Sequence, residues 1–216
     1  MSTKVLIFDL DGTLVDTIEG LAVAMNNVLE SCGLPQHEIE RYKEFVGNGV
    51  RNLVSNALPA EQRSPERIDS CYEKMLDQYR KYYSQGLKLY PGIEELLDTL
   101  KEKNYILAMN SNKNQEMTEK IAESILSKWD FFKVIGAESD FARKPDPAAA
   151  LYIAAEAGAQ AAECIYIGDS EVDHLTAQNA GMKNILVSWG FRPKDDLISL
   201  QPEVLVDHPM EILKAL

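Results

Sequence analysis

Residues 5–17 read VLIFDLDGTLVDT, an apolar run that ends in two aspartates, Asp9 and Asp11. The apolar part predicts a buried strand, yet carboxylates are seldom buried unless they are paired or bind a metal. Side chains two residues apart on a strand point to the same side, so both acids are expected to share one small volume. Aspartate and glycine are also ordinary turn residues, and a plain exit from strand to loop is the alternative interpretation.

The composition is typical of a soluble globular protein, with 45% hydrophobic and 26% charged residues among 216. The formal net charge is −12, so nucleic acid and anionic membranes are not expected partners. No apolar stretch approaches the roughly 18 residues of a membrane span, and the N-terminus is unlike a signal peptide. We therefore expect a cytoplasmic protein. The three cysteines, Cys32, Cys71 and Cys164, are far apart and odd in number, and are expected to be reduced packing residues.

Apolar runs rich in Val, Ile and Leu recur along the chain and predict strands. They lie at 4–8, 105–110, 133–137, 164–168 and 184–189, with an edge strand expected at 204–207. Most are separated by helical patterns, such as the apolar spacing from Ile93 to Leu100. This alternation predicts an α/β fold with a Rossmann-like parallel sheet sandwiched by helices. In such sheets the ligand site lies beyond the carboxyl ends of the strands.

The first crossover is too long for a single helix, because more than 70 residues separate FDLDG from YPGIEEL at 90–96. An apolar stripe from Ile18 to Cys32 predicts its first helix, with Asp16 and Glu19 as an N-terminal capping pair. Further helices are expected at 37–46, 49–57 and 65–85. We therefore predict an inserted α-helical cap domain at 16–86, and an α/β core domain made of 1–15 and 87–216.

Polar side chains follow several of the predicted strands. Asp9 and Asp11 follow the first strand, and Ser111, Asn112 and Lys113 follow the second. Lys144 stands in the stretch RKPDP at 143–147. Asp169 and Asp173 lie in the stretch GDSEVD. Clustered carboxylates repel one another, and a hard cation with oxygen ligands such as Mg²⁺ removes that repulsion. A lysine, a hydroxyl and an amide supply donors for phosphate oxygens. Together these residues predict a phosphoryl-transfer site.

The two acids of the first motif are expected to have different roles. A carboxylate can attack phosphorus and form an acyl phosphate that water then hydrolyses. Asp9 is nearest the strand and most rigidly placed, so it is the better nucleophile. Asp11, on the turn, is better placed to protonate the leaving oxygen and then to activate water.

The motifs DLDGTLVDT, NSNK, KPDP and GDSEVD, taken in order, resemble those of the haloacid dehalogenase superfamily. The chain is most similar to the phosphoglycolate phosphatase-like members, whose helical cap is inserted after the first strand. The resemblance covers essentially the whole chain and implies a phosphoric monoester hydrolase that uses Mg²⁺ and acts on a small phosphate ester. The dehalogenase branch typically lacks the second aspartate of the first motif, so Asp11 favours phosphate chemistry.

The resemblance also implies roles for individual residues. Asp9 would be the nucleophile, and Asp11 would be the general acid and base. Ser111 and Lys144 would bind the phosphate group. Mg²⁺ would be held by the carboxylates of Asp9 and Asp169 and by the main-chain carbonyl of Asp11, with Asp173 in support. Asp173 could instead only stabilise a helix N-terminus through the helix dipole.

In the inserted segment, VGNGVR at 46–51 is the most informative stretch. Two glycines there indicate a close approach of the backbone to a substrate or to the core domain. Gly49 and Arg51 are therefore candidate substrate-binding residues, although Arg51 could equally be an exposed helix residue. The resemblance implies a substrate-specificity loop in this region.

Several alternatives stay open at the level of the sequence. A sugar-phosphate mutase or a pyrophosphatase of the same superfamily could use the same residues. A phospho-aspartate signalling receiver is a different class, but receivers are shorter and lack a long helical insert. The identity of the phosphate ester and the choice between monomer and homodimer are not determined by the motifs.

Overall fold

The computed structural model describes residues 4–216. The chain divides into two compact units: a core unit, formed by the described residues up to Val15 together with Leu89–Leu216, and a helical unit, Asp16–Lys88. The short strands β2 (Val15–Asp16) and β3 (Lys88–Leu89) pair with each other, and the boundary between the units falls inside both. The chain therefore leaves and re-enters the core unit through two neighbouring segments.

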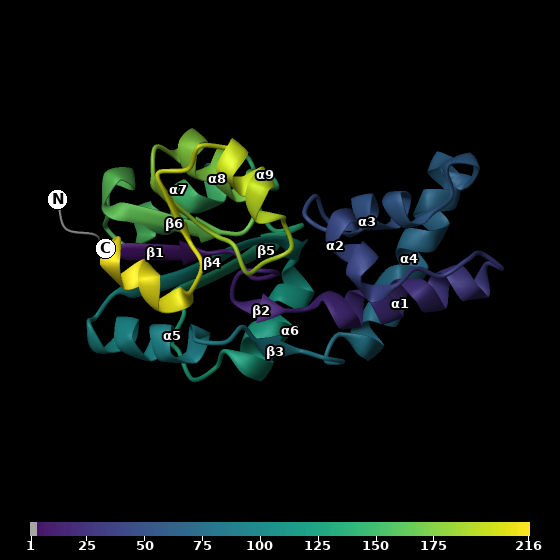
Figure 1. Ribbon diagram of the computed structural model, residues 1–216, viewed down its shortest axis with the longest axis horizontal. Helices are drawn as coiled ribbons and strands as arrows, with labels where there is room; N and C mark the ends of the chain where they lie inside the picture. Colours follow the sequence, from purple (N-terminus) through teal and green to yellow (C-terminus); the bar gives the residue numbers. More distant parts are fainter. Residues whose placement is uncertain (1–3) are drawn as a thin grey trace. The chain divides into compact units, whose positions relative to one another are not determined.

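The core unit contains a six-stranded parallel sheet in the order β5-β4-β1-β6-β7-β8 (Figure 1). The strands are β1 (Val5–Phe8), β4 (Ile106–Asn114), β5 (Lys133–Ala137), β6 (Cys164–Gly168), β7 (Lys183–Val187) and β8 (Val204–Val206). Every residue of β1 and β6 is buried, which is why both appear in the sequence as continuous apolar runs. The predicted α/β fold class is confirmed.

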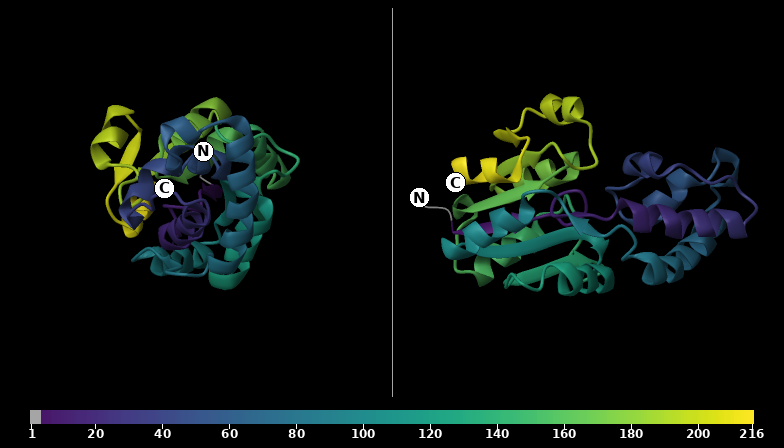
Figure 2. Two further views of the ribbon diagram at one scale, coloured as in Figure 1. Left: turned by 90° about the vertical axis from the view of Figure 1, so that its right-hand side faces the viewer. Right: turned by 60° about the horizontal axis from the view of Figure 1, so that its bottom comes forward.

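Helices cover both faces of the sheet (Figures 1 and 2). They are α5 (Ile93–Glu102), α6 (Gln115–Ile125), α7 (Ala148–Glu156), α8 (Glu171–Ala180) and α9 (Lys194–Ser199), with 3₁₀ turns η3 (Ala161–Glu163) and η4 (Pro209–Lys214). Small residues of α7 and α8, such as Ala150 and Ala177, pack with β1, β4, β5 and β6 in one apolar cluster. On α5 the predicted stripe from Ile93 to Leu100 is buried, which confirms the helical pattern there.

Strand β1 lies between β4 and β6, so it stands at the point where the order of the strands reverses. The register pairs Phe8 with Met109 on one side and with Ile167 on the other. The residues that follow each partner therefore leave the sheet at the same edge, which is the usual location of a ligand site in this architecture. Strand β4 continues to Asn114, four residues beyond the predicted end at 110, with an irregular register between Asn110 and Asn114.

The helical unit contains α1 (Ile18–Ser31), η1 (Ile39–Arg41), α2 (Tyr42–Phe45), α3 (Val50–Ala57), η2 (Ala60–Gln62) and α4 (Pro65–Tyr82). The predicted helix at 37–46 is a 3₁₀ turn followed by a single α-helical turn. The predicted capping pair of Asp16 and Glu19 is wrong: Asp16 ends strand β2, the N-cap is Thr17, and Asp16 Oδ1 accepts a hydrogen bond from the Ile18 N–H at 3.3 Å.

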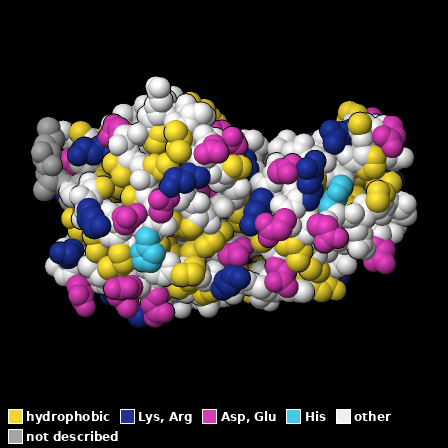
Figure 3. Space-filling model, in the orientation of Figure 1, with side chains coloured by type: hydrophobic (Ala, Val, Ile, Leu, Met, Phe, Trp, Pro, Cys, Tyr) yellow, Lys and Arg dark blue, Asp and Glu magenta, His cyan; other side chains and the backbone are white. Residues whose placement is uncertain are grey.

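The surface carries both signs of charge despite the net excess of acids. On the face drawn in Figure 3, acidic and basic side chains are interspersed over both units. Among residues 4–216, no helix combines the length and the apolar character that crossing a membrane requires.

Candidate active site

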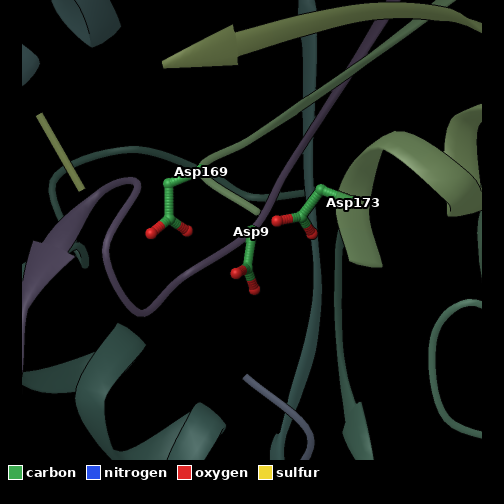
Figure 4. A group of neighbouring side chains, drawn as sticks. All are labelled: Asp9, Asp169 and Asp173. Carbon is green, nitrogen blue, oxygen red and sulfur yellow. The ribbon is translucent and has the colours of Figure 1, made fainter. Parts of the chain in front are cut away.

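Three buried carboxylates meet at the carboxyl end of the central strands (Figure 4). Asp9 follows β1, Asp169 follows β6, and Asp173 lies in the first turn of α8. One oxygen from each lies within 4.8 Å of the others. The Asp9 N–H donates to the carbonyl of Ile167 at 2.9 Å, so the ladder between β1 and β6 continues to the aspartate and fixes its backbone.

The Asp169 carboxylate is held from two sides. Its Oδ1 accepts from Thr13 Oγ1 at 3.3 Å, and its Oδ2 accepts from the Phe191 N–H at 2.7 Å. A Cβ atom added at Gly12 or at Gly190 would lie 2.3 Å from an atom of the Asp169 side chain, so glycine is required at both positions. Sequence reasoning missed these contacts. Thr13 belongs to the first motif, so its role could have been predicted from the sequence. Phe191 acts through its backbone N–H, so its side chain gives no indication of that role in the sequence.

Lys144 brings one positive charge into the carboxylate cluster. Its Nζ lies 2.6 Å from Asp173 Oδ1 and 2.9 Å from Asp9 Oδ1, and its side chain is 4% exposed. The second oxygen of Asp173 accepts from the hydroxyl of Ser170 at 2.6 Å. Asn112, a candidate substrate ligand from the sequence, has another partner here: its amide accepts from the Lys144 N–H at 2.8 Å and donates to the Lys144 carbonyl at 3.1 Å.

Asp11, the second acid of the first motif, pairs with a different lysine, Lys113. Lys113 Nζ lies 2.9 Å from Asp11 Oδ2, and the lysine side chain is 2% exposed. Although Lys113 was noted in the NSNK motif, sequence reasoning assigned it no role. Ser111 is buried beside it, and its hydroxyl oxygen accepts from the Lys113 N–H at 3.2 Å. The hydroxyl hydrogen of Ser111 therefore remains available to donate to a bound anion.

Negative charge exceeds positive charge in this buried cluster. Burial raises the pKa of Asp9, the charges of Asp173 and Asp11 add to the rise, and Lys144 opposes it; the result is a pKa of about 7. Burial, together with Asp173 and Asp9, likewise raises the pKa of Asp169 well above its usual range. Burial alone would lower the pKa of Lys144, but Asp173 and Asp9 hold it well above its ordinary value. Such a site is expected to gain stability from an added cation.

The donor set of the three aspartates fits a small hard cation. All three candidate ligand atoms are carboxylate oxygens, which Mg²⁺ and similar ions prefer, and they converge on one point. Lys144 and Ser170 engage both oxygens of Asp173, whereas Lys144 pairs with only Oδ1 of Asp9, so Asp9 is a better direct ligand than Asp173.

A model of the family described as haloacid dehalogenase-like hydrolase matches residues 6–187, most of the chain. This chain belongs to that family. The haloacid dehalogenase-like hydrolase is 33% identical to a phosphoglycolate phosphatase of Psychrobacter arcticus over 213 residues, which cover 96% of this chain and 93% of that protein. It is 30% identical to a phosphoglycolate phosphatase of Mannheimia succiniciproducens, with 98% of this chain and 97% of that protein covered.

Solved structures of the family have the same fold. A predicted phosphoglycolate phosphatase from Haemophilus somnus superposes with a TM-score of 0.88 at 27% identity, over 100% of this chain and 98% of that one. A haloacid dehalogenase-like family hydrolase from Streptococcus pneumoniae also gives 0.88, at 24% identity over 99% and 98% of the two chains, and supports the fold alone. This hydrolase is accordingly phosphoglycolate phosphatase-like, a phosphoric monoester hydrolase.

The two candidate substrate residues from the inserted segment lie in the helical unit. Gly49 is the N-cap of α3 with a φ of 83°, a conformation that favours glycine. Arg51 is exposed on α3 and forms an ion pair with Asp69 of α4. Roles for Gly49 and Arg51 in binding substrate stay predictions.

Proposed function

We propose that this hydrolase is a Mg²⁺-dependent phosphatase that cleaves a small phosphate monoester, of the phosphoglycolate type, through an aspartyl-phosphate intermediate. The observation that carries the proposal is the Asp9 carboxylate, fixed at the end of β1 with Lys144 Nζ at 2.9 Å and Asp169 beside it. The relatives named as phosphoglycolate phosphatases support the choice of substrate class.

In the first step a carboxylate oxygen of Asp9 attacks the phosphorus atom and the bond to the ester oxygen breaks. Asp11 gives its proton to that oxygen, so the leaving group departs as a neutral alcohol. Lys144 and the hydroxyl of Ser111 bind oxygens of the phosphoryl group and stabilise the charge that develops on them. Lys113 holds the carboxyl group of Asp11 in place for the transfer.

In the second step a water molecule attacks the phosphorus atom of the aspartyl phosphate. Asp11, now a carboxylate, accepts a proton from that water, the bond between Asp9 and phosphorus breaks, and inorganic phosphate is released. The carboxylate of Asp9 and the proton on Asp11 are thereby restored. Asp173 and Asn112 act through Lys144, whose ammonium group and backbone they hold.

Asp9, Asp169 and the main-chain carbonyl of Asp11 would hold Mg²⁺. The ion, when bound, neutralises charge on the carboxylates and on the phosphoryl oxygens, which allows a dianion to enter an acidic site. A cytoplasmic location is part of the same proposal and rests only on the reasoning from sequence.

The experiment is a panel of phosphate monoesters and pyrophosphate assayed with Mg²⁺, with excess chelator as the comparison. We expect phosphate release from a small carboxylated ester, its loss in chelator, and its return when Mg²⁺ is added. Asp9→Asn keeps the size of the side chain and removes the attacking charge, so its turnover should fall at least ~10³-fold, about 4 kcal/mol of barrier.

If pyrophosphate is the only compound in the panel from which phosphate is released, the enzyme is a pyrophosphatase and the proposal is wrong. Full activity in excess chelator would contradict the dependence on Mg²⁺. Near-normal turnover of a folded Asp9→Asn variant would contradict the assignment of Asp9 as the nucleophile.

A further inference from the structure

Two of the three cysteines lie together in the helical unit. Cys32 is the C-cap of α1, and Cys71 lies on α4, which packs beside α1 (Figure 1). Because α1 packs on α4, the two thiols are near enough for each to affect the pKa of the other. Both are reduced, Cys32 half-buried and Cys71 1% exposed. Neither belongs to the carboxylate cluster of the core unit, and the pair was expected from the sequence to serve only packing.

Positive charge surrounds this pair. Lys74 Nζ lies 3.8 Å from Cys32 Sγ, and Ser31 Oγ lies 3.7 Å from the same sulfur. Arg67, one helical turn before Cys71, adds a second cation whose charge acts on both thiols. The Nε of Arg67 is buried and has no hydrogen-bond partner among the described residues. A donor in that state is suited to an oxygen or a thiolate formed at the pair.

These surroundings affect the two thiols in opposite directions. Burial alone would raise the pKa of Cys32, but the contact with Ser31 and the charges of Lys74 and Arg67 bring it below its ordinary value. Burial, followed by the charge of Cys32, raises the pKa of Cys71. The pair thus combines a half-buried thiol that ionises more readily than usual with a buried thiol that keeps its proton more firmly, which is the arrangement of an attacking and a resolving cysteine.

We propose that Cys32 and Cys71 form an oxidation site that reacts with hydroperoxides and closes to an intramolecular disulfide. The Cys32 thiolate attacks one oxygen of the peroxide bond, which breaks; Cys32 becomes a sulfenic acid and the other oxygen leaves, with a proton, as water or an alcohol. The Cys71 sulfur then attacks the Cys32 sulfur, loses its proton, and expels the sulfenic oxygen as water. Two thiols and one hydroperoxide thereby give one disulfide, one alcohol and one water.

Cys164 provides the internal comparison. It lies buried in β6 of the core unit, its Sγ donates to the carbonyl of Gln160 at 3.4 Å, and burial raises its pKa to about 11. The charge of Glu163 adds to that rise, whereas at Cys32 the charge of Lys74 lowers the pKa. Packing alone would leave all three cysteines equally inert, whereas the proposal makes Cys32 and Cys71 react and Cys164 persist.

The test treats the reduced full-length chain with increasing hydrogen peroxide, blocks remaining thiols by alkylation, and maps the peptides without reduction. We expect a loss of about 2 Da, the two hydrogens removed when a disulfide forms, and a cross-linked peptide pair that contains Cys32 and Cys71. Reduction with dithiothreitol should restore both thiols. Cys164 should remain alkylated throughout, and Cys164→Ser should oxidise at the rate of the unchanged protein.

Two further variants separate reactivity from mere proximity. Cys71→Ser removes the resolving thiol, so a sulfenic acid should accumulate at Cys32 and be trapped by dimedone. Lys74→Gln should slow disulfide formation at least ~3-fold, because the thiolate loses its nearest cation. Lys81→Gln, an exposed lysine on the same helix two turns away, is the matched control and should leave the rate unchanged.

Oxidation of Cys164 at a similar rate would overturn the proposal, as would disulfides formed mainly between chains. Equal rates in Lys74→Gln and Lys81→Gln would also overturn it, because the pair would then react as any two neighbouring thiols. None of these measurements uses phosphatase activity, so they stand whatever the substrate assays give.

Discussion

Asp11 and Lys113 form the pair on which proton transfer depends in the proposed reaction. Lys113 is nearly inaccessible and its ammonium group lies 2.9 Å from Asp11 Oδ2. The neighbouring Asp9 has a different partner, Lys144. Two acids two residues apart are thus held by two different lysines, which gives them distinct surroundings for attack and for proton transfer.

Asp11→Asn should separate the two steps of the reaction. The amide can neither protonate a leaving group nor accept a proton from water, but nitrophenolate departs without a proton. With 4-nitrophenyl phosphate we therefore expect a burst of about one nitrophenolate per active site, then a steady rate at least ~10²-fold below that of the unchanged enzyme. Stopped-flow absorbance measures both phases.

The control for this experiment is Asp195→Asn, an exposed acid of α9 that should behave as the unchanged enzyme. An Asp11→Asn variant with full steady turnover, or one with neither burst nor turnover, would contradict the assignment of Asp11 to both proton transfers.

At the scale of elements, the turns after β1 and β7 enclose Asp169. The backbone N–H of Phe191 donates to its carboxylate, and Gly12 and Gly190 leave no room for a side chain. This packing, rather than any additional charged residue, orients the acid that we assign to the metal. Outer contacts of this kind typically change metal affinity 10–100-fold when they are altered.

Gly190→Ala should weaken the metal site specifically. The new Cβ would lie 2.3 Å from the Asp169 Cβ and 2.5 Å from the carbonyl oxygen of Gly12, so the carboxylate must shift. We expect the Mg²⁺ concentration for half-maximal activity to rise at least ~10-fold. Titration of activity with Mg²⁺ measures this value.

Gly158→Ala is a suitable control, because its φ of 65° strains any side chain but no atom lies within 4 Å of the added Cβ. It should lower stability and leave the Mg²⁺ dependence unchanged. The same Mg²⁺ dependence in both variants would mean that the turns do not position Asp169 for a cation.

The strands and the edge where the site lies could be predicted because they depend on local patterns. Fully buried parallel strands are continuous apolar runs, and the polar residues after them converge whatever the details of packing. The partners of those polar residues could not be predicted. Asn112 turns to the backbone of Lys144, 32 positions away, and only the folded chain brings the two together. The capping pair at Asp16 failed for a similar reason, since the pairing of β2 with β3 delays the start of α1.

At the scale of the whole molecule, the remaining prediction is that the core unit carries out the chemistry and the helical unit selects the substrate. The core residues that we assign to catalysis all act on the phosphoryl group, which every phosphate ester shares, so they cannot distinguish leaving groups. The sequence prediction assigns that choice to Arg51 and the loop at 47–49. In the structure Arg51 is exposed and paired with Asp69, so its guanidinium would have to exchange an exposed, solvent-screened ion pair for a substrate carboxylate.

Arg51→Ala tests that prediction. If Arg51 pairs with a substrate carboxylate, kcat/KM for the best carboxylated ester should fall at least ~10-fold, about 1.4 kcal/mol, while hydrolysis of an aryl phosphate changes little. Arg80→Ala, which removes the arginine of another exposed pair of the helical unit, is the matched control and should affect neither substrate. Equal losses on both substrates would assign Arg51 to folding, and no loss would leave it a surface residue.

The proposed function as a whole depends on a covalent bond between phosphorus and Asp9, and that bond can be detected directly. The enzyme, and in parallel the Asp11→Asn variant, is mixed with Mg²⁺ and a phosphate ester, quenched in acid within one turnover, and treated with borohydride, which reduces an acyl phosphate to an alcohol. Peptide mass spectrometry then locates the reduced residue. We expect homoserine at position 9, only when ester and Mg²⁺ are both present, and most abundantly in the variant. Homoserine at position 11 or 169, or at no position during active turnover, would contradict the proposal.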